Sequence, residues 1–192
     1  MSPQGSPNAA VDDLDPGEYR ATMGGFATGV AVITVSHQDR LHGMTANAVM
    51  SVSLTPPLLA VAIDNNSHTN ELIADAGHFT VNLLAEGADT LALRFARRGA
   101  RAAELFTEGP YQSSATGDPT LPGQLAHLAC RVHSRHVEGD HTLWIGRVVQ
   151  AGRPGALVDP LLFVRGRFTT VTCRACITRQ DPIGVLQILH DG

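Results

Sequence analysis

The chain has 192 residues, 43% of them apolar and 17% charged, and a formal net charge of −4, which predicts one globular domain with a sizeable core. The negative charge argues against a nucleic-acid partner, and no apolar run reaches the roughly 20 residues that a membrane-spanning helix needs. Three cysteines are too few for a disulfide scaffold, which favours a reducing, cytoplasmic environment.

The chain is predicted to begin with a flexible tail at residues 1–15, which is polar and acidic and lacks the cationic start and apolar stretch of a secretory signal. A helix is predicted next, because Asp15 and Pro16 suit the N-cap and the first helical position. It should run over 17–27 and place three apolar side chains on one buried face: Tyr19, Met23 and Phe26.

Short segments rich in β-branched residues, separated by turn residues, dominate the rest of the chain. The strands expected are 30–35, 41–54, 58–63, 78–84, 125–137, 142–151, 161–164 and 167–171. Short helices are expected up to Asp75 (capped by Asn66 or Ser67), at 88–96 and at 181–189. Residues 97–122 are expected to form a long surface excursion. Many strands with few short helices predict a mainly β protein, built as a barrel.

The segment most informative about chemistry is 43–57 (GMTANAVMSVSLTPP). It collects Thr, Asn and Ser among small apolar residues, where a strand made only for a core would carry Val or Ile. A flavin needs this mixture, because its ring wants apolar walls, its pyrimidine edge wants backbone amides and its phosphate wants hydroxyls. An edge strand with one wet face has a similar composition, so the residues alone leave both interpretations open.

This segment and residues 19–34 (YRATMGGFATGVAVIT) resemble the short flavin reductases of two-component flavin monooxygenases, above all the reductase components of phenol and 4-hydroxyphenylacetate hydroxylases. Further matching segments follow in the family's order: 78–84 (HFTVNLL), 139–148 (GDHTLWIGRV) and 159–168 (DPLLFVRGRF). The resemblance implies an FMN-binding split β-barrel at 16–171, assembled as a homodimer, with 172–192 as a C-terminal extension. It also implies hydride transfer from NADH or NADPH to FMN or FAD, with reduced flavin supplied to a separate monooxygenase.

The resemblance implies roles for individual residues as well. The isoalloxazine ring would be lined by Thr45, Ala46, Asn47 and Ala48, and its pyrimidine and ribityl side by Ser51, Val52 and Ser53. The flavin phosphate would lie near Asn65, Ser67 and Arg94. The nicotinamide would be positioned by His141, and the dinucleotide covered by Arg167 and Phe168. This chain departs from the family in two places, since Ser is common at the position of Ala48 and Tyr at that of Phe168.

His141 lies in a Gly-Asp-His-Thr turn, where a solvated histidine is the structural alternative to a functional one. Because hydride passes directly between stacked rings, a functional His141 would position the nicotinamide rather than take a proton. A cluster of arginines is either a solvated helix end or a phosphate site, and Arg94 is favoured for the phosphate among its members: Arg94, Arg97, Arg98 and Arg101.

Cys173 and Cys176 form a C-x-x-C pair near the C-terminus. A zinc site would need two more ligands, and the nearby candidates are Cys130, His133 and His136. On a strand, His133 points away from the other two. No metal site is therefore predicted.

Two competing functions remain open. One is another flavin enzyme on the same barrel, such as an oxidase of the pyridoxamine-phosphate type or a haem-degrading relative, against which the motifs at 139–142 and 166–168 argue. The other is a flavin-carrying or partner-binding protein without turnover, in which residues 169–192 would act as a docking element.

Overall fold

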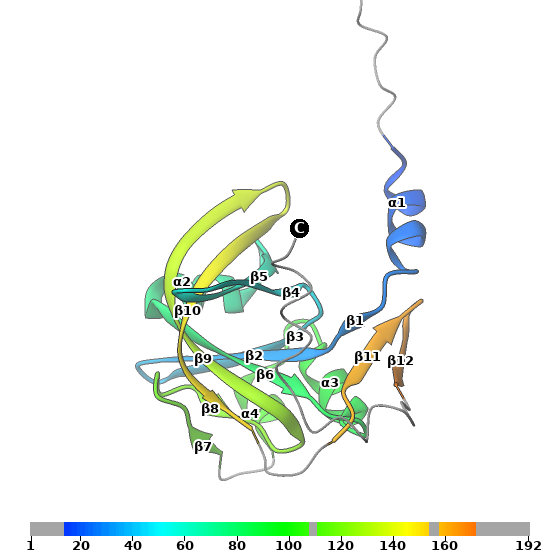
Figure 1. Cartoon of the computed structure of the whole chain (residues 1–192). Coiled ribbons are helices and arrows are strands. Elements are labelled where there is room, and N and C mark those ends of the chain that lie inside the picture. The colour runs from blue at the N-terminus through cyan, green and yellow to red at the C-terminus, as the bar shows by residue number, and fades with distance from the viewer. Residues whose placement is uncertain (1–13, 108–110, 154–157, 172–192) are drawn as a thin grey trace, which may run out of the picture.

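The computed structural model describes residues 14–107, 111–153 and 158–171 (Figure 1). Most of the predicted tail at 1–15 lies outside these residues, as do Cys173, Cys176 and the helix predicted at 181–189. The helices of the described part are α1 (Pro16–Met23), α2 (His68–Ala76), α3 (Asp89–Phe95) and α4 (Ala102–Leu105). Its strands are β1 (Thr28–Gly29), β2 (Ala31–His37), β3 (Arg40–Ala46), β4 (Val49–Leu54), β5 (Pro57–Asp64), β6 (His78–Leu84), β7 (Gln112–Ser113), β8 (Pro119–Thr120), β9 (Gln124–Glu138), β10 (His141–Gly152), β11 (Leu161–Val164) and β12 (Arg167–Thr170).

Seven strands form one antiparallel sheet in the order β3-β2-β6-β9-β10-β5-β4. The long β9–β10 hairpin bends across the molecule, so the sheet curls around its contents (Figure 1). In the described residues the edge strands β3 and β4 are not paired with each other, and the barrel stays split. A smaller sheet, β1-β11-β12, lies beside it. The prediction of a mainly β split barrel with short helices is confirmed.

The central strand β2 explains why the core has two parts. Its first five residues, Ala31–Val35, are all buried and all apolar except Thr34, as expected for a strand that is covered on both faces. Ile33 and Val35 point into a cluster inside the curled sheet and under α2, together with Phe79 and Trp144. Val32 points to the opposite face, into a second cluster beneath α3 and α4. The sheet is therefore held between two apolar layers, and Trp144 is buried in the inner one.

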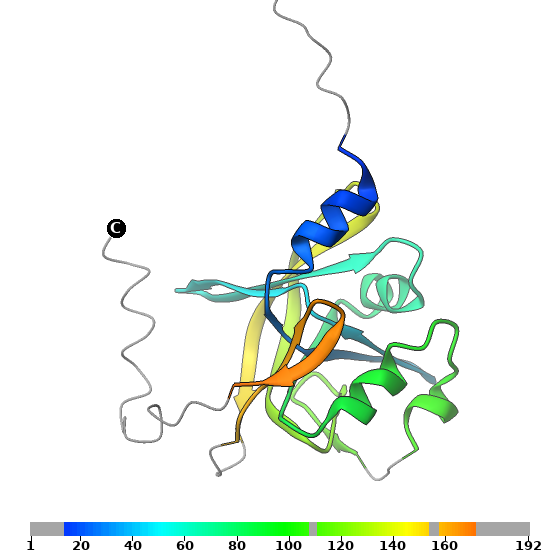
Figure 2. The ribbon, with the colours of Figure 1, turned by 90° about the vertical axis from the view of Figure 1, so that its right-hand side faces the viewer.

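The first helix is capped as the sequence predicts, but it is not buried as the sequence predicts. The Asp15 carboxylate accepts hydrogen bonds from the backbone N–H groups of Gly17 and Glu18 at 2.9 and 3.0 Å. No residue of α1 is buried, and Phe26 is 67% exposed, so the expected core face is wrong. The reason is position: α1 ends at Met23 and stands beyond the sheet, above the β11–β12 hairpin (Figure 2).

The strand predicted at 41–54 is two strands. β3 pairs with β2 at one edge of the large sheet, whereas β4 pairs with β5 at the other edge. The chain crosses between them at Asn47 and Ala48, where the Ala48 carbonyl accepts a hydrogen bond from Ala62 N–H at 3.0 Å. This crossing holds the segment singled out by the sequence at the mouth of the split. Within the described residues no helix is long and apolar enough to cross a bilayer.

Candidate active site

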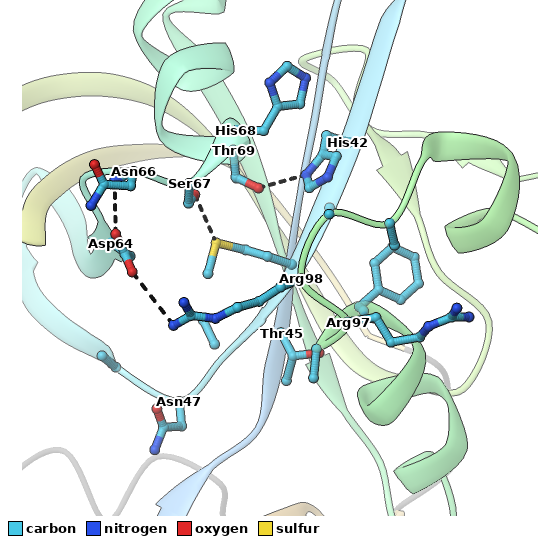
Figure 3. Close-up of a pocket in the computed structure, with 18 of the residues that line it drawn as sticks. His42, Thr45, Asn47, Asp64, Asn66, Ser67, His68, Thr69, Arg97 and Arg98 are labelled. Carbon is cyan, nitrogen blue, oxygen red and sulfur yellow. Dashed lines mark hydrogen bonds and ion pairs between the residues drawn. The ribbon is translucent and has the colours of Figure 1, made fainter. Parts of the chain in front are cut away.

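A cavity of about 1100 Å³ opens where the split barrel separates, at the upper end of the size range of small-molecule sites. Four parts of the chain surround it: the β3–β4 junction, the β5–α2 turn, the loop between α3 and α4, and the β9–β10 turn. α1 and the β11–β12 hairpin complete the wall with Arg20, Phe163 and Phe168. Figure 3 shows the polar side chains that β3, the β3–β4 junction, the β5–α2 turn and the loop between α3 and α4 place around it.

The β3–β4 junction contributes Thr45, Ala46, Asn47 and Ala48 to the cavity, the four residues predicted to line the isoalloxazine. The Thr45 hydroxyl donates to the Ala92 carbonyl at 2.6 Å, which ties the strand to α3. At Gly43 the backbone of β3 lies directly against α3, because a Cβ there would lie 2.7 Å from the Phe95 ring. The junction therefore presents small side chains and backbone from a firmly held strand, as a flat ring requires.

The β5–α2 turn supplies hydroxyls, amides and one carboxylate. Asp64 accepts a hydrogen bond from Asn66 N–H at 2.8 Å, which shapes the turn. Of the two N-cap candidates, Asn66 and Ser67, it is Ser67 that caps α2, with its hydroxyl accepting a hydrogen bond from Asn70 N–H at 3.2 Å. Asp64, Asn66 and Ser67 all line the cavity. Asn65 does not, because its side chain bridges the β9–β10 turn through the Gly139 carbonyl and the Thr142 hydroxyl, at 3.1 and 2.7 Å.

The β9–β10 turn brings His141 to the cavity wall, half-exposed and beside Asp140. The Asp140 carboxylate accepts a hydrogen bond from Nδ1 of His141 at 2.6 Å. This hydrogen bond, and then the charge of His141, hold the pKa of Asp140 below the ordinary aspartate value. Because an ionised carboxylate only accepts hydrogen bonds, Nδ1 is the donor of this pair, and Nε2 is the acceptor nitrogen whenever the ring is neutral.

The loop between α3 and α4 places Arg97, Arg98 and Arg101 along the cavity. Arg98 reaches Asp64 on the opposite wall, with 3.9 Å between its Nη2 and the Oδ2 of the carboxylate (Figure 3). Arg94, which the sequence favoured for phosphate, lies instead in a separate hollow of about 220 Å³ beside Leu91. The last turn of α3 points its side chain away from the large cavity, and the sequence carries no signal for that orientation.

A pair of histidines was not singled out by the sequence. His42 and His68 both line the cavity, with ring centroids 5.1 Å apart in an edge-to-face arrangement. Nδ1 of His42 is also hydrogen-bonded to the Thr69 hydroxyl at 2.8 Å. Burial lowers the pKa of His42 below the ordinary histidine value, the charge of His68 adds to the effect, and a hydrogen bond to the Ala100 backbone opposes it. The only available signal was that His42 directly precedes segment 43–57.

Of the remaining residues predicted to bind a cofactor, one lines the cavity and four do not. Phe168 lines the cavity and packs against Phe163, with ring centroids 5.5 Å apart. Arg167, its neighbour on β12, is exposed and outside the cavity lining. Three further residues lie on β4, also outside the lining: Ser51, Val52 and Ser53.

Cys130, one of the potential metal ligands considered, is directed into the core. Burial, followed by the charge of Asp118, raises the pKa of its thiol to about 12. Because the thiolate is the form that binds metal, Cys130 is a poor ligand.

The charges of the cavity favour an anionic ligand, because its lining contains four arginines against two aspartates. The lining also contains small and aromatic apolar residues, among them Ala46, Ala48, Ala62, Phe163 and Phe168. An elongated molecule with a flat ring and a phosphate satisfies both features. The residues present therefore fit a flavin nucleotide.

A family model described as a flavin reductase like domain matches residues 23–172. The chain belongs to the flavin reductase family. It is 35% identical over 150 residues to the FMN reductase (NADH) SmoA of Agrobacterium fabrum, a match that covers 78% of this chain and 83% of that protein. It is 36% identical over 158 residues to the reductase component of a 4-nitrophenol 4-monooxygenase/4-nitrocatechol 2-monooxygenase of Rhodococcus opacus, with 82% of each chain covered.

Among solved structures, the chain is similar to the NADH:FAD oxidoreductase SgcE6 of Streptomyces globisporus in complex with NAD and FAD fragments. The TM-score is 0.77 at 33% identity, and the alignment covers 84% of this chain and 95% of that one. The predicted function of a flavin reductase is confirmed. The oxidase and flavin-carrier interpretations are not favoured, since these relatives are reductases.

Proposed function

We propose that this flavin reductase takes hydride from NADH, passes it to FMN or FAD held in the cavity, and supplies the reduced flavin to a separate monooxygenase in the cytoplasm. The names of its relatives support the choice of NADH and of a partner oxygenase. The observation that carries the proposal is that the small-residue junction at 45–48 and His141 open onto one cavity. A ring lying on the junction is then within reach of a group positioned by His141.

The reduced nicotinamide supplies the hydride and the bound flavin accepts it, so the protein has to orient rings rather than move protons. The junction residues Thr45–Ala48 present the surface on which the flavin ring lies. Phe168, braced by Phe163, covers the cavity from the side of the small sheet. Asp140 fixes the tautomer of His141, so that Nε2 accepts a hydrogen bond from the nicotinamide carboxamide.

We further propose that the protein is a homodimer. β4 is an edge strand of the large sheet, and the β4–β5 hairpin projects from the body of the molecule (Figure 2). Met50 and Leu54 of β4 are 58% and 55% exposed and Val52 between them is 46% exposed, so apolar side chains are gathered on this free edge. The apolar residues of α1 are exposed as well. A second copy that covers β4 removes both the free edge and the apolar surface.

The direct test is to measure the oxidation of NADH and of NADPH by the purified protein with FMN, with FAD and without flavin. We expect flavin-dependent oxidation of NADH at a rate well above that of NADPH. Oxidation that does not depend on flavin, or no oxidation of either nucleotide by protein that binds flavin, would contradict the proposal.

The role of His141 is tested by the variant His141→Ala. Removing one positioning hydrogen bond costs about 1 to 1.5 kcal/mol, and we therefore expect the KM for NADH to rise about tenfold. The flavin dissociation constant should stay unchanged. His136→Ala, an exposed histidine on the same hairpin, is the matched control. Equal KM values in the two variants would show that His141 is only a solvated turn residue.

A further inference from the structure

The loop between α3 and α4 faces the β5–α2 turn across the cavity, and one of its arginines extends to the other side. Figure 3 shows the Arg98 side chain directed toward Asp64 and the adjacent Arg97 side chain directed away from it. Arg101, the third arginine of the loop, lies 3.5 Å from the Glu104 carboxylate. Arg98 is thus the arginine of this loop that delivers a charge to the β5–α2 turn.

The contact between Arg98 and Asp64 is easily exchanged for another. The Arg98 side chain is 95% exposed, the distance to Asp64 is 3.9 Å, and the Asp64 side chain is 36% exposed. Exposed ion pairs of this kind contribute little to stability. A phosphate gives a guanidinium shorter, bidentate hydrogen bonds, which are the stronger interaction. A phosphate that enters the cavity can therefore take Arg98 from Asp64.

The β5–α2 turn has no positively charged lysine or arginine of its own with which to bind a phosphate. Residues 64–69 (DNNSHT) contain hydroxyls, amides and a histidine, but neither lysine nor arginine. Asp64 adds a negative charge that repels a phosphate. A positive charge that reaches this end of the cavity from the facing wall offsets the Asp64 charge and favours a phosphate there.

The loop that carries Arg98 is attached to the strand on which the flavin ring is proposed to lie. Thr45 of β3 is hydrogen-bonded to the Ala92 carbonyl of α3. His42, also on β3, is hydrogen-bonded to the backbone of Ala100, two residues beyond Arg98. The backbone on either side of Arg98 is therefore tied to β3, which carries the flavin segment.

We propose that Arg98 is a specificity-determining residue that binds the phosphate of the flavin nucleotide, exchanging Asp64 for the phosphate when the nucleotide enters. The reductase then prefers FMN and FAD to riboflavin, which has the same ring and no phosphate. This inference rests on the proposed function, because it takes the cavity to be the flavin site.

The test is a fluorescence titration of the full-length protein with riboflavin, FMN and FAD. For Arg98→Ala we expect the dissociation constants of FMN and FAD to rise about tenfold or more, the effect of losing a charge-assisted hydrogen bond, while that of riboflavin stays the same. Arg97→Ala, which removes the same charge from the neighbouring cavity position, is the comparison variant and should weaken FMN and FAD binding less than Arg98→Ala does, because its side chain is directed away from the β5–α2 turn. Asp64→Asn should bind FMN more tightly, because Arg98 is no longer shared.

An unchanged preference for FMN over riboflavin in Arg98→Ala would overturn the inference. Equal losses in Arg97→Ala and Arg98→Ala would also overturn it, since the loop would then act only through its overall charge. A raised KM for NADH with unchanged flavin binding would assign Arg98 to the dinucleotide phosphates and refute the flavin assignment. If the wild-type protein binds no flavin, the proposed function itself fails, and this is seen before any variant is compared.

Discussion

His42 lies on β3 beside the start of α2, where burial and the neighbouring His68 favour its neutral form. The unfolded chain takes up a proton near the ordinary histidine pKa of about 6.5, whereas the folded chain takes it up only at lower pH. The contribution of His42 to stability is therefore complete above that pKa and is lost as the pH falls below it.

We predict that the melting temperature of the wild type falls more steeply between about pH 7.5 and about pH 5.5 than that of His42→Gln. Thermal unfolding followed by circular dichroism measures both. His136→Gln removes an exposed histidine and should keep the wild-type pH dependence. A His42→Gln curve parallel to the wild type would refute this account of the histidine pair.

Asp118 is a fully buried carboxylate outside the active site. It accepts hydrogen bonds from the Ser36 backbone at 2.9 Å and from the hydroxyls of Thr80 and Thr116 at 3.2 and 2.6 Å. The His78 ring lies 3.1 Å from its oxygens. Asp118 therefore fastens the β7–β8 segment to the end of β2 and β6.

We predict that Asp118→Asn destabilises the protein by about 3 kcal/mol, because the new amide N–H group faces donors in place of an acceptor oxygen. For a chain of this length that is about 10 °C in Tm. Asp39→Asn in the exposed β2–β3 turn is the control and should melt as the wild type does. A change below about 1 kcal/mol would mean that the network is not a structural anchor.

At the scale of the elements, the β9–β10 hairpin depends on one close approach. β10 has a register shift between Ile145 and Gly146, and a Cβ on Gly146 would lie 2.7 Å from the Phe79 ring and 2.8 Å from the Cys130 Cβ. The hairpin can cross the core here only because the side chain is absent.

We predict that Gly146→Ala costs about 1 to 3 kcal/mol through overpacking. The additional substitution Phe79→Leu should relieve part of that cost, which a double-mutant cycle in urea measures. Gly29→Ala on β1 is a suitable control, since nothing lies within 4 Å of a Cβ there. Additive effects of Gly146→Ala and Phe79→Leu would contradict the contact.

The elements that local chemistry determines could be predicted from the sequence. The Asp15 and Ser67 caps and the strand at 78–84 are found where capping residues and β-branched runs indicate. The burial of α1 could not be predicted, because apolar spacing shows a helical face but not whether another element covers it. The break of the 41–54 strand could not be predicted either, since it results from pairing with β2 and β5, which are distant in the chain.

In the candidate site, too, the residues that belong to a local motif could be predicted and the others could not. Segment 43–48 and His141 could be found because a motif carries them, and both line the cavity. Arg98 and His68 have no motif of their own. They reach the cavity from a loop and a helix start that only the folded chain brings together, so the choice among the arginines could not be made from spacing alone.

For the whole molecule, the homodimer proposal predicts that β4 controls assembly. We expect the double variant Met50→Glu, Leu54→Glu to elute as a folded monomer near 20.3 kDa, with the wild type at twice that mass. Size-exclusion chromatography with light scattering makes the measurement. Leu93→Glu introduces the same charge at a residue of α3 that is 59% exposed and should leave the dimer intact. A dimer in the double variant would exclude β4 as the interface.

The central claim is that this one cavity brings flavin and NADH together for hydride transfer. It is tested most directly by mixing the flavin-loaded protein with one equivalent of NADH without oxygen and following the visible absorbance of the flavin. We predict complete loss of that absorbance in the wild type, and the same loss at higher NADH concentration in His141→Ala. A bound flavin that stays oxidised in excess NADH would contradict the claim.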